Sequence, residues 1–222
     1  IASKKSVTHH GFFIGATNDN ITDLQSVEGM EGVCGIKIFM GSSTGDLLVD
    51  QQKQLENIFA NTGGIIATHA EDEERLQQRT TEFEHRTDIA SHAECRDVEC
   101  AFLATKRAAS LAKDHDHRLH IVHLTSQKEA DWLQKNKGDL ITTEVCTQHL
   151  TFDQDDVESL GERVLMNPPI RYTEDRDSLW RRLKDGTIDC VVTDHAPHTL
   201  KSKSVGFPDA PAGMPGVETS LP

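Results

Sequence analysis

Short apolar segments alternate with amphipathic ones along this chain, and the alternation limits the folds that it can adopt. Six segments have the length and composition of strands, at residues 12–16, 35–40, 64–69, 119–124, 140–145 and 187–193. Segments with apolar residues at helical spacing lie between them, at residues 50–62, 94–115, 127–136 and 173–184. This order predicts an α/β fold with parallel strands and right-handed crossovers. Six strands are too few to close an eight-stranded barrel.

Length, charge and cysteine content narrow the class of protein. The alternation runs without a break through all 222 residues, so we expect residues 1–222 to form a single domain. The net charge of −13 argues against a nucleic-acid partner. No apolar run approaches the roughly 20 residues that cross a bilayer, and no signal-peptide pattern opens the chain. Five scattered cysteines without a Cys-x-x-Cys pair favour reduced thiols and a cytoplasmic protein.

The first and last residues suggest a piece of a longer protein. The chain opens at Ile1 rather than at Met, inside a helix-like segment, and it stops directly after Thr-Ser-Leu-Pro. We therefore expect the single domain to be incomplete at both ends.

Residue types that bind metals or transfer protons lie within or directly after four of the predicted strands. They are Lys37 in Gly-Ile-Lys-Ile-Phe-Met, His69 in Ile-Ile-Ala-Thr-His, His123 in His-Ile-Val-His, and Asp194 directly after the segment 187–193. The carboxyl ends of parallel strands meet at one face of a barrel, where barrel enzymes keep their active sites. Imidazole and carboxylate groups are common zinc ligands. Four such residues in order predict one metal site assembled from separate strands.

Each of these residues also has a structural explanation. A buried histidine can hydrogen-bond to neighbouring backbone, and Asp194 could cap a helix, although no clear helix begins after it. Lys37 could pair with a neighbouring acid or extend to the end of its strand. In the functional interpretation, burial lowers the pKa of Lys37. Its neutral amine can then react with carbon dioxide to give a carbamate that bridges two metals.

Substrate contacts are expected in the long irregular segments 147–171 and 199–218, because barrel enzymes keep them in loops of this kind. Asn167 precedes two prolines, which restrict the backbone and could direct its amide toward a pocket. Asn167 could equally be an ordinary turn residue. His198 lies beyond the turn that follows Asp194, which makes it a candidate substrate contact.

Together these motifs resemble dihydroorotase, a family in the amidohydrolase superfamily of metal-dependent (β/α)8 barrels. The matching segments are Ile-Lys-Ile-Phe-Met-Gly-Ser-Ser-Thr-Gly at Lys37, Thr-His-Ala-Glu-Asp at His69, Val-His-Leu-Thr-Ser at His123, Met-Asn-Pro-Pro-Ile-Arg at Asn167, Thr-Asp-His-Ala-Pro-His at Asp194 and His198, and Pro-Ala-Gly-Met-Pro-Gly-Val-Glu-Thr at Ala212 and Gly213. The resemblance runs over essentially the whole chain. It implies a partial TIM-type (β/α)8 barrel that comprises strands 3 to 8.

The resemblance also implies a role for each residue. Two zinc ions would be held by Lys37 in N6-carboxylated form, His69, His123 and Asp194. Asp194 would also be the catalytic proton shuttle. The substrate would be contacted by Asn167, His198, Ala212 and Gly213.

The implied activity is the reversible interconversion of dihydroorotate and N-carbamoyl-L-aspartate in pyrimidine biosynthesis, carried out by a homodimer. One alternative is another cyclic amidase, either a hydantoinase (dihydropyrimidinase) or an allantoinase. Another is a non-catalytic dihydroorotase-like partner of aspartate transcarbamoylase. The chain lacks the family's first-strand His-x-His-x-Arg motif and the following Met-Pro-Asn-Thr segment. We therefore expect this polypeptide on its own to be inactive or nearly so.

Overall fold

A single parallel sheet runs through the molecule. The computed structural model describes residues 1–43 and 47–220. Its strands follow one another in sequence order, and each pairs in parallel with the next. They are β1 (Phe12–Gly15), β2 (Val33–Phe39), β3 (Ile65–His69), β4 (Arg118–Ile121), β5 (Ile141–Cys146) and β6 (Cys190–Val192). The predicted α/β fold with six parallel strands is confirmed.

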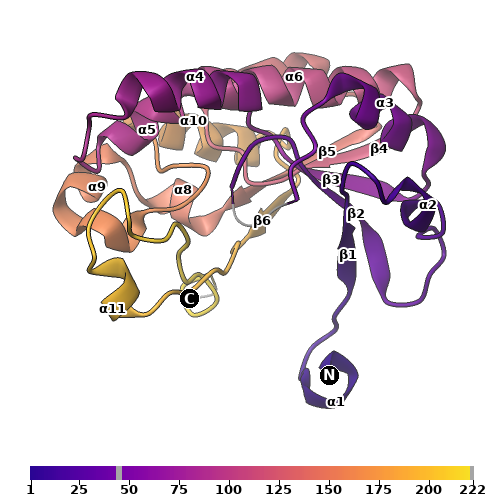
Figure 1. The fold of residues 1–222 in the computed structure, drawn as a ribbon, viewed down its shortest axis with the longest axis horizontal. Coiled ribbons are helices and arrows are strands. Elements are labelled where there is room, and N and C mark those ends of the chain that lie inside the picture. The colour runs from indigo at the N-terminus through magenta and orange to yellow at the C-terminus, as the bar shows by residue number, and fades with distance from the viewer. Residues whose placement is uncertain (44–46, 221–222) are drawn as a thin grey trace.

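The helices connect these strands, and α3, α4 and α6 lie together along one side of the sheet (Figure 1). The helical elements are α1 (Ala2–Lys5), α2 (Ile21–Leu24), α3 (Gln52–Asn61), α4 (Glu73–Phe83), α5 (Ser91–Cys95), α6 (Val98–Asp114), α7 (Gln127–Asn136), α8 (Thr147–Thr151), α9 (Gln154–Leu160), the 3-10 turn η1 (Gly161–Val164), α10 (Thr173–Lys184) and α11 (Leu200–Lys203). Within residues 1–43 and 47–220, no helix combines the length and the apolar character needed to cross a membrane.

The structure corrects three predicted boundaries and shows several helices that were not predicted, of which α4 is the longest. The helix expected at residues 94–115 begins at Val98, because the side chain of Asp97 accepts the backbone N–H of Cys100 and caps it. The strand expected at residues 119–124 ends at Ile121, and the last strand is shorter than residues 187–193. Helix α4 was not predicted, because it buries only Glu73 and Leu76 and therefore has a weak apolar stripe.

The hydrophobic core lies between the sheet and the helices. Successive side chains of a strand point to opposite faces, so Ile36 and Ile38 of β2 are fully buried in this core. Phe59 of α3 and Ala104 of α6 pack in the same cluster. Lys37 lies between the two isoleucines and therefore faces the other side of the sheet. That second face carries the polar residues of the candidate site.

Candidate active site

A cavity of about 310 Å³ lies at the carboxyl ends of the strands. Seven of the eight predicted site residues line it, namely Lys37, His69, His123, Asn167, Asp194, Ala212 and Gly213. The eighth residue, His198, is exposed and does not line the cavity; its Nε2 donates a 3.1 Å hydrogen bond to the carbonyl oxygen of Ala212. Parallel strands in sequence order bring these residues together, because the ends of all six strands lie at one edge of the sheet.

Two imidazole rings meet at the floor of the cavity. His69 Nδ1 lies 2.9 Å from His123 Nε2, and both side chains are buried. Nitrogen ligands on one tetrahedral zinc ion lie about 3.3 Å apart, a separation that a small movement of these rings would produce. Burial lowers the pKa of both histidines, so both rings are neutral near pH 7. Neutral imidazole is the form that binds metals.

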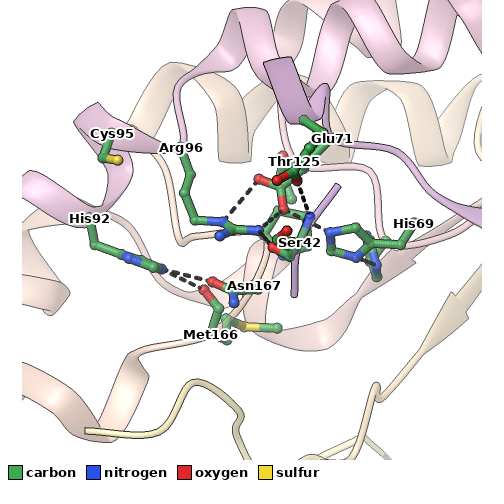
Figure 2. Close-up of polar contacts among 12 residues, drawn as sticks. Ser42, His69, Glu71, His92, Cys95, Arg96, Thr125, Met166 and Asn167 are labelled. Atoms are coloured by element: carbon green, nitrogen blue, oxygen red, sulfur yellow. Dashed lines mark hydrogen bonds and ion pairs between the residues drawn. The ribbon is translucent and has the colours of Figure 1, made fainter. Parts of the chain in front are cut away.

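The other nitrogen of His69 faces a carboxylate. His69 Nε2 lies 2.7 Å from Glu71 Oε2 (Figure 2). Burial raises the pKa of Glu71, but the neighbouring Arg96 and His69 outweigh this effect and hold it below its usual value. The ionised carboxylate can only accept a hydrogen bond. The proton of the His69 ring is therefore on Nε2, and the lone pair of Nδ1 points toward His123.

Lys37 reaches the cavity from β2, and among residues 1–43 and 47–220 no acidic group lies at contact distance from it. In the part of the chain that the structure describes, its Nζ forms no ion pair, and it lies 5.0 Å from the centre of the Phe39 ring. Burial lowers the pKa of Lys37 to about 8, although Glu144 and Asp194 act in the opposite direction. A fraction of this amine is therefore neutral near pH 7. The neutral form is the one that reacts with carbon dioxide.

Two of the candidate ligands have an unusual backbone conformation. His123 and Asp194 follow β4 and β6, and their φ angles are +41° and +40°. Side chains other than glycine seldom adopt this left-handed region, and such strain concentrates at functional sites. Burial raises the pKa of Asp194, and Lys37 partly offsets that effect. Helix α11 is capped by Thr199, so Asp194 is not a helix cap.

Asp194 lies on the same cavity as the two histidines but does not contact them. Among the described residues it makes no hydrogen bond to His69 or to His123. It follows β6, which is an edge strand of only three residues. Hydrogen bonds hold the residues on either side of Asp194, from Gln148 Nε2 to the carbonyl oxygen of Thr193 and from the N–H of Ala196 to the carbonyl oxygen of Met214.

The far wall of the cavity is formed by Asn167 and by the Ala212–Gly213 segment. The amide oxygen of Asn167 accepts a hydrogen bond from His92 Nε2 at 3.0 Å (Figure 2). The backbone N–H of Gly213 donates to the carbonyl of Leu165 at 2.9 Å. Gly213 has a φ of +140°, and a Cβ there would lie 2.6 Å from the carbonyl oxygen of Ala196. Only glycine fits this position without moving the wall.

A second group of possible metal ligands lies on the same face of the sheet, on three adjacent strands. One donor atom each of His120, Glu144 and Cys190 lies within 4.8 Å of the others. His120 Nε2 and Glu144 Oε2 are 2.9 Å apart, and the other oxygen of Glu144 accepts the backbone N–H of His123. Glu144 also lines the main cavity, so it links this group to the candidate site.

Sequence analysis missed several residues that shape the site. Glu144 could have been found, because a charged residue inside an apolar strand is the same signal that identified Lys37. Glu71 stands two residues after His69 and offered a weaker signal. His92 and Arg96 gave none, because they reach the site only through the way α5 lies against the strand-end loops.

Comparison with known proteins shows which family the chain resembles. No family model matches the chain. A dihydroorotase from Halobacterium salinarum is 35% identical over 188 residues, which cover 84% of this chain and 43% of the relative. An allantoinase from Streptomyces avermitilis is 34% identical over 235 residues, which cover 100% of this chain and 51% of the relative.

A solved structure extends the similarity to the fold. The L-hydantoinase (dihydropyrimidinase) from Arthrobacter aurescens matches with a TM-score of 0.88 and 27% identity, over 96% of this chain and 49% of that chain. The curled six-stranded sheet is therefore part of a TIM-type barrel, as predicted. The chain spans about half the length of the curated relatives that it matches. It belongs to the dihydroorotase-like cyclic amidohydrolases.

Proposed function

We propose that the protein carrying this chain is a zinc-dependent dihydroorotase, which interconverts dihydroorotate and N-carbamoyl-L-aspartate in pyrimidine biosynthesis. The observation that carries the proposal is the pair of neutral imidazoles of His69 and His123, which face each other beside Lys37. Relatives named dihydroorotase support it. Cytoplasmic location and a homodimer are part of the same proposal.

The donor groups are of the kinds that bind divalent metal ions of the zinc type. His69 Nδ1 and His123 Nε2 would hold one ion, and Asp194 would bind the other. Lys37, once carboxylated, would bridge the pair. When bound, such ions polarise an amide carbonyl and make water a stronger nucleophile at neutral pH.

The remaining steps belong to residues of this chain. Asp194 would take a proton from the attacking water and deliver it to the ring nitrogen that leaves. In the direction of ring closure the same carboxyl would act first as an acid. The substrate would be held in the orientation needed for ring opening by Asn167, the Ala212–Gly213 backbone and His198. This contribution is a positioning effect.

A second cyclic amidase activity is the main alternative. The allantoinase relative is as similar as the dihydroorotase relative, and the structural match is a hydantoinase. The motif Met-Asn-Pro-Pro-Ile-Arg at Asn167 favours dihydroorotase in our interpretation. A non-catalytic partner of aspartate transcarbamoylase would be expected to lose metal ligands, and this chain keeps four candidates.

The test is a comparison of substrates on one sample. The protein that carries this chain would be purified, its zinc content measured, and dihydroorotate, hydantoin and allantoin assayed side by side. We expect about two zinc ions per chain and the highest kcat/KM on dihydroorotate. A higher value on hydantoin or allantoin would move the assignment to that amidase. Zinc-free protein with no turnover of any substrate would reject the proposal.

A further inference from the structure

Segment 91–96, which consists of α5 and the following Arg96, reaches the candidate site at two separate points (Figure 2). Arg96 binds Glu71, which in turn binds the candidate metal ligand His69. His92 binds Asn167, the candidate substrate contact. The catalytic chemistry proposed above uses neither His92 nor Arg96.

Arg96 fixes the charge and position of Glu71. Its Nε donates to Oε1 at 3.2 Å and its Nη2 donates to Oε2, so the guanidinium grips both oxygens. The same Nη2 donates to the carbonyl oxygen of Ser42 at 2.6 Å, in the loop that follows β2. The Glu71 side chain has no exposed surface. A carboxylate buried in this way remains ionised only if it is paired.

The hydrogen bonds from Arg96 to Glu71 determine which nitrogen of His69 is available to bind a metal. An ionised Glu71 requires a proton on Nε2 of His69, and the acceptor nitrogen Nδ1 is then directed at His123. The other tautomer, with its proton on Nδ1, would place the lone pair of Nε2 against the carboxylate. Partners of this kind set the tautomer of ligating histidines and their orientation.

His92 orients the side chain of Asn167 in a similar way. Its Nε2 lies 3.0 Å from Asn167 Oδ1 and 3.1 Å from the carbonyl oxygen of Met166. Both partners are acceptors, so the imidazole proton is on Nε2. Because the amide oxygen of Asn167 is engaged outside the cavity, its NH₂ group is the part left to face a ligand. A ligand carbonyl or carboxylate oxygen is the group that this donor would bind.

From this geometry we infer that His92 and Arg96 are positioning residues, and that one short segment orients both the metal ligand and the substrate contact. Arg96, through Glu71, presents Nδ1 of His69 to the metal. His92 presents the NH₂ group of Asn167 to a carbonyl or carboxylate oxygen of the substrate. The identity of the bound metal and substrate rests on the proposed function. The tautomers of His69 and His92 do not depend on it.

The tautomers are tested first, on metal-free protein. Long-range ¹H–¹⁵N correlation spectra of the histidine rings would be recorded for the 222-residue polypeptide. We expect the Nε2–H form for His69 and for His92. A Nδ1–H signature at His69 or at His92 overturns the inference, and no variant has to fold for this result to count.

The metal arm uses three arginine variants and zinc as the probe. Zinc affinity of the same polypeptide would be measured by competition with a chromophoric chelator. Arg96→Met is expected to weaken it by about 10–100-fold, the range found for such partners of metal ligands. Arg96→Lys should restore part of the loss. The matched control is Arg86→Met, because Arg86 pairs with Asp88 and Glu94 at the surface. Equal affinity in Arg96→Met and Arg86→Met contradicts the inference.

The substrate arm separates binding of substrate from binding of metal. In the protein that carries this chain, His92→Leu is expected to raise KM about tenfold with a smaller change in kcat and unchanged zinc content. His92→Gln, which can keep a donor near the position of Nε2, should restore most of KM. An unchanged KM in His92→Leu would refute this role. If the unaltered protein binds no zinc and opens no cyclic amide, the proposed function fails, whereas the tautomer measurement still decides the positioning.

Discussion

Asp194 combines a left-handed backbone with a carboxyl group at the cavity, and this combination is open to a direct test. Asparagine tolerates the same backbone conformation but cannot carry a proton. Asp194→Asn in the protein that carries this chain should therefore lower kcat by about 10²–10⁴-fold, the usual contribution of a general acid–base group. The midpoint of urea unfolding should stay unchanged.

The control for this change is Asp177→Asn, because Asp177 on α10 has a largely exposed side chain. It should leave both kcat and stability as they are. Turnover in Asp194→Asn that equals turnover in Asp177→Asn would show that another group moves the proton.

At this scale the sequence predicted which residues line the site better than it predicted how they are held. Lys37, His69, His123 and Asp194 were found because a polar residue at the end of an apolar strand is a local signal. The contact from Arg96 to Glu71 joins residues 25 positions apart. It depends on where α5 lies after folding, so no spacing rule reveals it. His198 was expected to contact the substrate; it does not line the cavity itself, and its Nε2 donates to the carbonyl oxygen of Ala212, which does.

At the scale of the elements, β2 and β3 approach each other closely at one glycine. Gly35 has a φ of +156°, and a Cβ there would lie 2.2 Å from the carbonyl oxygen of Ile65 on the neighbouring strand. Gly35→Ala must push the two strands apart, and we expect a loss of roughly 1–3 kcal/mol in the free energy of unfolding. Urea denaturation of the polypeptide measures this difference.

Gly186→Ala is the matched control, because Gly186 also has a positive φ, +80°, but nothing lies within 4 Å of its added Cβ. This variant should show the backbone strain alone, roughly 1–2 kcal/mol. If Gly35→Ala is no more destabilising than Gly186→Ala, the close approach of the strands is not what constrains Gly35.

Helices α6 and α7 pack around a buried acid, which makes stability depend on pH. Glu129 of α7 accepts hydrogen bonds from Thr105 and Ser126, and burial raises its pKa above the ordinary value of 4.5. The folded state therefore holds this proton more tightly than the unfolded state. Its contribution to stability is complete below pH 4.5 and is lost as pH rises through the folded pKa.

Glu129→Gln removes that titration and keeps the hydrogen-bonding shape. We expect the variant to lose less stability than the unaltered protein when pH is raised from 4.5 to 8. The free energy of unfolding from urea titrations at several pH values provides the measurement. If the free energy of unfolding changes with pH equally in the two proteins, burial of Glu129 does not oppose its ionisation in the folded state.

Elements with a clear spacing of apolar residues were predicted from the sequence, whereas elements that depend on tertiary contacts were not. Strands β1, β2, β3 and β5 were placed within two residues of their bounds, and so were α3, α7 and α10. The last strand was predicted too long, because Ile188 extends the apolar pattern to residues that precede the pairing with β5. The spacing of apolar residues predicted one helix at residues 94–115. The capping residue Asp97 divides this segment, so that α6 begins at Val98.

At the scale of the whole molecule, β1 and β6 are the edges of the sheet in the part of the chain that the structure describes. Phe12 and Phe13 of β1 are 58% and 45% exposed, and Val191 of β6 is 45% exposed. Edge strands with apolar side chains pair readily with other chains. We expect the 222-residue polypeptide to self-associate with increasing concentration, as seen by sedimentation velocity.

Phe13→Lys should shift that association to higher concentration, because a charged side chain blunts a strand edge. Leu103→Lys is the control, since Leu103 is an exposed apolar residue on α6, away from the edges. Equal association of the two variants, or a monomer at every concentration, would show that the edge β1 is not the contact surface.

The cavity wall that includes Ala212 and Gly213 is attached to the rest of the molecule through hydrogen bonds to its own backbone groups. Ala196 N–H donates to the carbonyl of Met214, and Lys203 Nζ donates to the carbonyls of Leu165 and Pro211. The metal-ligand candidates His69 and His123 come from strand ends elsewhere. A relative could therefore exchange this loop for another, and so change which ring it accepts, while inheriting the histidine pair unaltered. In such a lineage, substrate preference would diverge faster than the chemistry that opens the ring.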